Sequence, residues 1–185
     1  PLSGVVIARD ESDRIARCVT SLAAVCDEVL VLDSGSVDGT QAVARAAGAR
    51  VESQPWLGFS AQKNAAIARA RHGWVLLLDA DEWLTPQAQA RIRALCAPGA
   101  KSEAGIERAD VWRLHRRTHF LGTPLRFGGW GRESVDRLFR ADLRYLDAEV
   151  HERLDLQGRR VAVLPARIEH DTARSLAEYR DKLAG

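Results

Sequence analysis

The sequence predicts an α/β fold in which helices flank a mainly parallel sheet. Two features of the first half predict it: short apolar runs alternate with segments of helical periodicity, and each run ends in polar residues. Buried parallel strands end in this way where they reach the ligand-binding edge of a sheet. Beyond residue 98 the pattern changes to shorter segments of β character, which predicts a smaller mixed-β region.

Length and composition favour a single domain over residues 1–185. A chain of 185 residues with 46% hydrophobic residues is long enough for one well-buried core and short for two. Its longest apolar runs reach five or six residues, so we expect a soluble chain without a transmembrane helix or a signal peptide. The sequence starts within an apolar run and stops just after residues 175–179, a capping box that opens a helix. We therefore expect a piece of a longer protein, truncated at the C-terminus.

The individual elements follow from the same patterns. In the first half, the predicted strands are residues 2–8, 28–32, 49–52 and 74–78. The predicted helices have Ser12 and Asp38 as N-caps, open at Ser60, and run from Thr85 to about residue 98. In the second half, β character is found at residues 111–114, 135–139 and 161–164. The regular alternation predicts right-handed crossovers, as in Rossmann-like nucleotide-binding domains, although no G-x-G-x-x-G follows the first strand.

The most informative stretch for chemistry is the fourth predicted strand and the residues after it. Asp79 and Asp81 follow five apolar residues, and a buried strand has little room for charge, so both carboxylates are expected at its C-terminal end. Carboxylate oxygens suit Mg2+ or Mn2+ holding a polyphosphate better than zinc or copper. The alternative is that Asp81 or Glu82 merely caps the following turn, because D-x-D is a short and common motif.

Other polar positions are also candidates for a site. Asp33 directly follows the second strand, within a turn of small polar residues, and is expected to be free to meet a ligand. Lys63 lies in the first turns of a helix, where backbone N–H groups favour anions, although a solvent-exposed lysine is the alternative. Polar clusters at residues 151–153 and 169–171 follow apolar residues, and a surface ion-pair cluster is the alternative for residues 151–153.

The charges and cysteines add further expectations. The net charge of +2 hides an excess of arginine: residues 113–140 hold seven arginines against Glu133 and Asp136. Such a stretch suits phosphates or a lipid surface, with a solvated charged face as the common alternative; a nucleic-acid partner is not expected. The three cysteines lack C-x-x-C spacing, so we expect small core residues in a reducing cytoplasm.

Three stretches, residues 31–40, 58–64 and 78–82, resemble family 2 glycosyltransferases of the GT-A fold. Residues 120–122, 128–130, 137–140 and 150–153 resemble more closely the bacterial subgroup of lipopolysaccharide core β-1,4-glucosyltransferases. The resemblance runs in order over nearly the whole chain. It departs from the subgroup at residues 131–133, where relatives tend to carry an aromatic residue and an Asp, and this difference bears on the acceptor more than on the reaction.

The resemblance implies a set of site residues. Residues 1–98 would form the nucleotide-sugar-binding half, with Ala8, Arg9, Glu11, Asp33, Lys63, Asp79, Ala80 and Asp81 in the donor site. Asp33 would contact the nucleotide base, and Asp81 and His170 would hold Mg2+ or Mn2+. Residues 99–185 would form the acceptor and catalytic half, with Gly129, Trp130 and Glu133 on the acceptor side. Of the acidic residues Glu133, Asp136 and Glu152, Glu152 fits best as the general base.

The implied reaction moves a hexose, glucose being favoured, from a UDP-sugar to a glycan or glycolipid with inversion, in lipopolysaccharide or cell-surface glycan biosynthesis. The expected location is the cytoplasm, with possible peripheral attachment to the inner face of the cell membrane.

Three other classes of protein remain as alternatives. A haloacid-dehalogenase-type phosphatase usually has Thr or Val where this chain has Trp83, and a sugar nucleotidyltransferase would have a glycine-rich basic loop within residues 2–14. A non-catalytic nucleotide-sugar-binding module is excluded least well.

Overall fold

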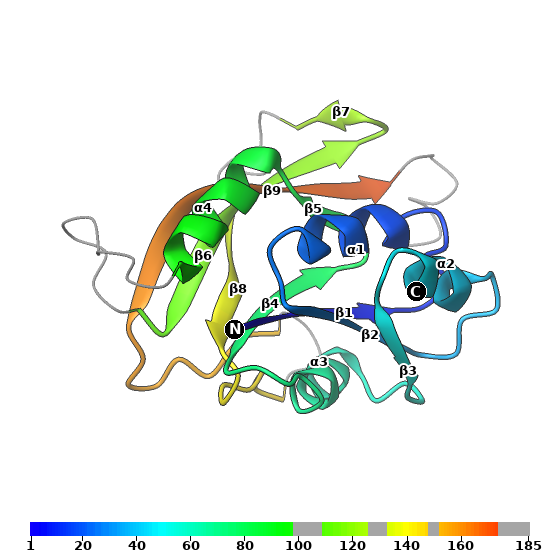
Figure 1. The fold of residues 1–185 in the computed structure, drawn as a ribbon, viewed down its shortest axis with the longest axis horizontal. Helices are drawn as coiled ribbons and strands as arrows, with labels where there is room; N and C mark the ends of the chain where they lie inside the picture. Colours follow the sequence, from blue (N-terminus) through cyan, green and yellow to red (C-terminus); the bar gives the residue numbers. More distant parts are fainter. Residues whose placement is uncertain (98–108, 126–132, 148–151, 174–185) are drawn as a thin grey trace.

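A computed structural model describes residues 1–97, 109–125, 133–147 and 152–173 (Figure 1). Within these residues the strands form one nine-stranded sheet in the order β3-β2-β1-β4-β8-β6-β9-β5, and β7 pairs with β6. The strands are β1 Leu2–Ala8, β2 Glu28–Asp33, β3 Arg50–Ser53, β4 Trp74–Asp79, β5 Glu82–Leu84, β6 Val111–Phe120, β7 Thr123–Pro124, β8 Glu133–Arg140 and β9 Val161–Ala173. The helices are α1 Ile15–Ala23, α2 Thr40–Ala46, α3 Phe59–Ile67 and α4 Pro86–Cys96.

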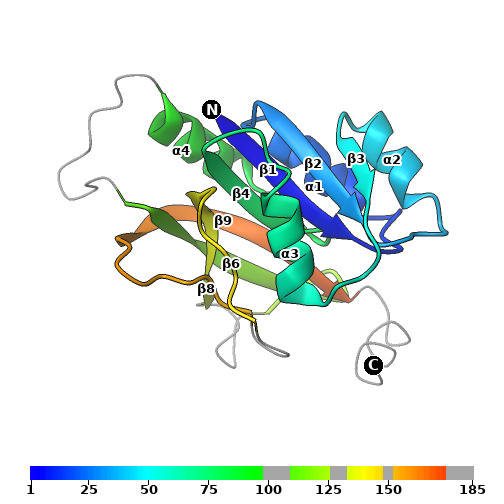
Figure 2. The ribbon, with the colours of Figure 1, turned by 90° about the horizontal axis from the view of Figure 1, so that it is seen from below.

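The first half is a parallel sheet, because β1 pairs in parallel with both β2 and β4, and β2 with β3. Alternation along β1 supplies the two faces of the core: Val6 belongs to the cluster that α1 and α4 cover, and Val5 to the cluster that α3 covers. Figures 1 and 2 show α1 and α3 on opposite faces of these strands. The predicted α/β fold with a mainly parallel sheet flanked by helices is therefore confirmed.

The second half continues the same sheet. β8 pairs antiparallel with β4 and with β6, and β9 runs parallel to β6 and pairs antiparallel with β5. The predicted segments 111–114 and 161–164 were too short, since β6 and β9 extend to Phe120 and Ala173. Charged residues hide these extensions in the sequence, because arginines of β6 pair with carboxylates of β8 and β9 across the sheet.

Two helix starts differ from the prediction. Ser12 is not the N-cap of α1, whose N-cap is Arg14; the Ser12 backbone N–H instead donates to Asp38 Oδ2 at 3.0 Å. Gly39, with φ of 93°, is the N-cap of α2 instead of Asp38, yet Asp38 Oδ1 accepts the Thr40 N–H at 3.0 Å and so provides the expected capping bond from one residue earlier. The predicted helix at residues 175–179 lies outside the described residues.

Two further features of the fold concern its cysteines and the length of its helices. Cys18 is buried as predicted, whereas Cys96 is exposed near the end of α4, so the prediction of three core cysteines is wrong for Cys96. No helix in the described part of the chain combines the length and the apolar character needed to cross a membrane.

Candidate active site

The candidate site lies where β1, β2 and β4 end, at the carboxyl edge of the parallel strands. Ala8 ends β1, Asp33 ends β2 and Asp79 ends β4, and the Ser34 N–H donates to the Ala8 carbonyl at 2.9 Å. Ala80, which is buried, lies in the turn that carries the chain from Asp79 into β5. Ligands of open α/β sheets bind at this edge, so the fold places the predicted donor residues where a ligand is expected.

Lys63 links three parts of the site. Its side chain is only 6% exposed, and Nζ lies 3.4 Å from Asp79 Oδ1 and 3.6 Å from Glu152 Oε2. It also lies 5.4 Å from the centre of the Tyr145 ring. A buried cation between two carboxylates rules out the alternative of a solvent-exposed lysine. The predicted base, Glu152, is thereby brought beside the first aspartate of the D-x-D.

Asn64 holds the backbone of Tyr145, which follows β8. Its Nδ2 donates to the Tyr145 carbonyl at 2.9 Å, and its Oδ1 accepts the Tyr145 N–H at 2.7 Å. This pair of hydrogen bonds joins α3 to the chain after β8. The neighbouring residues Asn64 and Lys63 of α3 therefore contact Tyr145 and Glu152, respectively. His151, the neighbour of Glu152, lies outside the described residues.

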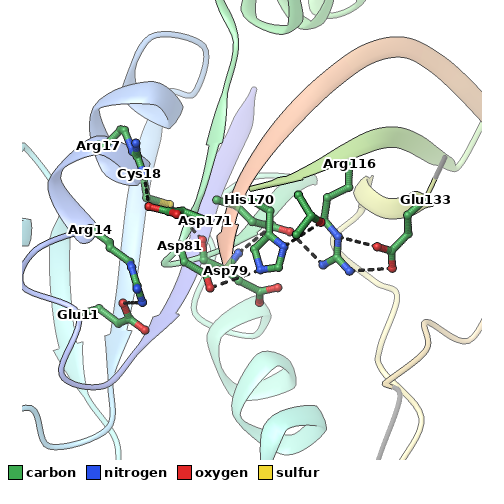
Figure 3. A network of polar contacts seen from close by, with 12 residues as sticks. Glu11, Arg14, Arg17, Cys18, Asp79, Asp81, Arg116, Glu133, His170 and Asp171 are labelled. Atoms are coloured by element: carbon green, nitrogen blue, oxygen red, sulfur yellow. Dashed lines mark hydrogen bonds and ion pairs between the residues drawn. The ribbon is translucent and has the colours of Figure 1, made fainter. Parts of the chain in front are cut away.

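The predicted metal ligands Asp81 and His170 also meet (Figure 3). His170 Nε2 lies 3.4 Å from Asp81 Oδ2, and His170 Nδ1 lies 3.3 Å from the Thr118 hydroxyl. The Asp171 N–H donates to the Asp81 carbonyl at 3.0 Å, which holds the D-x-D turn against β9. Two ligands of an octahedral ion at about 2.1 Å would lie about 3 Å apart, so the carboxylate and imidazole fit as one edge of a Mg2+ or Mn2+ site.

This pair of side chains would need partners to complete such a site. Among the described residues no group of three or more His, Cys, Asp or Glu side chains is arranged to hold an ion. Mg2+ commonly takes one or two carboxylates and completes its shell with water and substrate phosphates. A donor set of Asp81, His170 and a diphosphate is consistent with that chemistry.

Asp79 and Glu82 share one cation. Arg137 Nη2 lies 2.5 Å from Asp79 Oδ2 and 2.7 Å from Glu82 Oε1, and Glu82 is completely buried. Burial alone would raise the pKa of Asp79, but the charges of Arg137 and Lys63 outweigh it and hold this pKa well below its usual range. Burial raises the pKa of Glu82, with Arg137 opposing the rise. Neither Arg137 nor Glu82 was predicted as a site residue.

The arginine-rich stretch has a structural explanation. Arg113 pairs with Asp136, Arg116 with Glu133 and Glu82, Arg117 with Glu169 and Arg137 with Asp79, while Arg140 stacks on the Trp74 ring. Every described arginine of residues 113–140 thus has a partner inside the chain. The predicted surface for phosphates or lipids is therefore mostly an internal ion-pair system.

Glu133 and the other acceptor-side residues are placed less completely. Both oxygens of Glu133 accept from Arg116, at 3.0 Å from Nε and 2.7 Å from Nη2 (Figure 3). Gly129 and Trp130 lie outside the described residues. Arg9 and Glu11 follow β1: Arg9 is largely exposed and Glu11 pairs with Arg14 at 3.3 Å. The Glu11 N–H donates to the Thr40 hydroxyl at 2.8 Å, which ties this loop to the turn after Asp33.

Asp33 is not free, contrary to the prediction. It is completely buried, and its Oδ2 accepts from the Gly35 and Ser36 N–H groups and from Gln41, at 2.8 to 3.0 Å. Its Oδ1 accepts from the Ser36 hydroxyl at 2.5 Å. Burial alone would raise the pKa of Asp33, but these hydrogen bonds outweigh it and lower the pKa below its ordinary value. Asp33 therefore shapes the turn, and its contact with the nucleotide base stays a prediction.

Asp33→Ala is expected to lower the free energy of unfolding by about 1–3 kcal/mol at pH 7, because buried donors lose their acceptor. Since folding lowers the pKa of Asp33, its contribution is complete above the unfolded pKa of about 3.9 and is lost as pH falls through the lower folded value. Urea unfolding at pH 7 and at pH 3 should show the difference between parent and variant shrinking in acid. A difference that is the same at both pH values would contradict this account.

Comparison with solved structures defines the class of the fold. The chain superposes on residues 1–349 of S. aureus TarS, solved in complex with UDP-GlcNAc, with a TM-score of 0.66 and 15% identity over 96% of this chain and 60% of that TarS fragment. A mannosyltransferase of Pyrobaculum calidifontis, solved with GDP-Man and Mn2+, matches with a TM-score of 0.50 and 19% identity over 63% of this chain and 35% of that protein. A Rossmann-like sheet with carboxylates at its carboxyl edge and a mixed-β continuation is the GT-A-like arrangement.

The sequence comparisons then give the family. Residues 3–120 match glycosyl transferase family 2, and the chain belongs to this family. It is 42% identical over 96 residues to an uncharacterised glycosyltransferase of Rickettsia conorii, covering 52% of this chain and 34% of that protein. It is 30% identical over 167 residues to the lipopolysaccharide core biosynthesis glycosyltransferase LpsC of Rhizobium meliloti, covering 85% of this chain and 58% of LpsC. The chain thus spans a third to three fifths of these relatives' lengths.

Proposed function

We propose that this glycosyltransferase moves a hexose, with glucose the expected sugar, from a UDP-sugar to a hydroxyl group of a saccharide or lipid-linked saccharide, inverting the anomeric carbon. The observation that carries the proposal is the position of Lys63, which joins the first aspartate of the D-x-D to Glu152. A carboxylate is thereby held next to the place where a nucleotide sugar would lie. The complex of TarS with UDP-GlcNAc and the function of LpsC support the choice of donor class and of pathway.

The structure favours Glu152 over the other two candidates as the base. Glu133 has both oxygens engaged by Arg116, and Asp136 is paired with Arg113 at 2.7 Å. Glu152 lies 3.6 Å from Lys63, beyond a direct hydrogen bond, and its side chain is 21% exposed. It therefore keeps the capacity to accept a proton from an acceptor hydroxyl.

The transfer can be written with its bonds balanced. The acceptor oxygen forms a bond to the anomeric carbon, the bond from that carbon to the diphosphate oxygen breaks, and Glu152 takes the hydroxyl proton. A divalent ion, when bound by Asp81 and His170, would neutralise charge on the leaving diphosphate. Lys63 supplies a buried positive charge beside Asp79 and Glu152. The leaving group departs as a nucleoside diphosphate, and a single displacement inverts the sugar.

Location is a further proposal. We propose that transfer takes place in the cytoplasm, at the inner face of the cell membrane where the acceptor is lipid-linked. Free Cys18, Cys26 and Cys96 suit a reducing compartment.

A thermal-shift screen of nucleotide sugars in Mn2+ tests the donor. A ligand that binds only the folded state at a hundred times its dissociation constant adds about 2.7 kcal/mol, which is readily detected as a raised Tm. We expect UDP-glucose and UDP to raise the Tm in Mn2+ more than in EDTA, and GDP-sugars to have a smaller effect. A shift with GDP-mannose that exceeds the shift with every UDP-sugar would contradict the proposed donor.

A further inference from the structure

A row of alternating charges crosses the site. It runs through Glu133, Arg116, Glu82, Arg137, Asp79, Lys63 and Glu152, with successive distances of 2.7, 3.4, 2.7, 2.5, 3.4 and 3.6 Å. The two strongest candidates for the base stand at its ends, and the first aspartate of the D-x-D stands within it. Arg137 is the central member, and neither the family resemblance nor the proposed reaction gives it a role.

Arg137 closes the turn that carries the D-x-D. One nitrogen, Nη2, contacts both Asp79 Oδ2 and Glu82 Oε1, while Glu82 Oε2 accepts the Asp79 backbone N–H at 3.1 Å. The guanidinium reaches the turn from β8, which is the antiparallel neighbour of β4. The side chain and the backbone of Asp79 are therefore both held by the same pair, Arg137 and Glu82.

This arrangement leaves Asp79 with one accessible side. Arg137 and Lys63 are each 6% exposed and take one carboxylate oxygen each, whereas the Asp79 side chain keeps 33% of its surface exposed. The two buried cations contact the Asp79 carboxylate on its protein side, and the rest of the carboxylate is exposed to solvent. A rotation of Asp79 toward an ion at Asp81 and His170 would take one carboxylate from each of these buried cations, leaving Arg137 with Glu82 and Lys63 with Glu152, and this loss opposes the rotation.

We propose that Arg137 is a positioning residue that gives the two aspartates of the D-x-D different roles. It keeps Asp79 out of the metal shell and available to the nucleotide sugar, so that Asp81 alone supplies the carboxylate ligand. This inference rests on the proposed function and deepens it. A purely structural ion pair would affect the stability of the fold, but would leave the affinity of the folded protein for UDP, and the dependence of that affinity on Mn2+, unchanged.

The test compares Arg137→Lys with Arg113→Lys. Lysine keeps the charge, but its ammonium is a compact, strongly hydrated group on a shorter side chain, so it would not reproduce the position of Nη2 between Asp79 and Glu82. Arg113 is the control, because it pairs with Asp136, the neighbour of Arg137 on β8, at 2.7 Å from β6 and in a half-exposed position, and it contacts neither Asp79 nor Glu82. Calorimetric titration with UDP at fixed Mn2+ should show binding weakened about 10-fold or more for Arg137→Lys, the size of effect typical of residues that orient a ligand-binding side chain, and no change for Arg113→Lys.

A charge-balanced double variant provides the test if Arg137→Lys does not fold. Arg137→Gln combined with Glu82→Gln removes one cation and one carboxylate together, which avoids an unpaired buried charge. Weakened UDP binding by a variant with a cooperative melting transition supports the positioning role. A UDP affinity equal to that of the parent at every Mn2+ concentration overturns the positioning role of Arg137, while the proposed function stands. A parent that does not bind UDP in Mn2+ overturns the proposed function, and the inference with it.

Discussion

Glu152→Gln is expected to reduce sugar transfer by about 100- to 10,000-fold, the usual contribution of a general base. A sugar hydroxyl is a very weak acid, so a carboxylate must receive its proton as the new bond to the anomeric carbon forms. Glutamine has nearly the same shape but cannot accept that proton. Lys63 would keep its contact with Asp79, 3.4 Å away, so UDP affinity in Mn2+ should stay close to that of the parent.

The control for this variant is Glu133→Gln. Glu133 is held by Arg116 through both oxygens, so its loss should affect the stability of that part of the sheet more than the rate of transfer. Steady-state rates and calorimetric UDP affinities of the two variants separate the roles. Transfer by Glu152→Gln at close to the parental rate, together with a large loss for Glu133→Gln, would move the base to Glu133.

Asp81→Ala is expected to weaken UDP binding in Mn2+ by about 10- to 100-fold and to remove the difference between Mn2+ and EDTA. The reason is that Asp81 supplies the carboxylate of the pair that Asp81 and His170 form at 3.4 Å. His170→Ala should act in the same direction. Calorimetric titration of UDP in Mn2+ and in EDTA measures both.

A suitable control for Asp81→Ala is Asp142→Ala. Asp142 is an exposed carboxylate that pairs with Arg159 at 2.8 Å on the surface, so its loss removes the same charge without touching the carboxyl edge of β4. It should leave UDP binding and its metal dependence intact. Equal UDP affinity of the parent protein in Mn2+ and EDTA would show that no ion bridges the nucleotide to Asp81.

The parallel half of the fold was predictable because its central strands β1, β2 and β4 are buried on both faces. Val5, Val6 and their neighbours in β1 form an apolar run, and the helix that follows, α1, buries one largely apolar face. The site residues at the ends of these strands were predictable for the same reason, since polar residues end each apolar run. Asp79 and Asp81 were found in this way, and the structure places both at the carboxyl edge.

The mixed half was less predictable because its stability rests on cross-strand pairs of charged residues. The segment His115-Arg116-Arg117-Thr118-His119 lacks the apolar alternation of a strand, yet it is the centre of β6 and pairs with both β8 and β9. Only the register shows that Arg117 faces Glu169 and that Arg116 faces Glu133. The sequence likewise cannot show that β8 delivers Arg137 to the D-x-D turn.

The surroundings of Asp33 and Lys63 could not be predicted from local patterns. Asp33 stands where a ligand is expected, but the small residues after it turn their N–H groups back onto its carboxylate. Lys63 lies near a helix N-terminus and looks like a surface residue in sequence. Its partners Asp79 and Glu152 come from distant parts of the chain, so its burial follows from tertiary structure alone.

The most direct test of the whole account is the identity of the small product that the parent protein releases from UDP-glucose in Mn2+. The reaction should be run with a panel of saccharide and lipid-linked saccharide acceptors. The account predicts free UDP, released only when an acceptor is present, together with an acceptor that carries a sugar of inverted configuration. Conversion of UDP-glucose and added pyrophosphate to UTP and glucose 1-phosphate, release of inorganic phosphate, or tight binding of UDP-glucose without any product across the panel would contradict it.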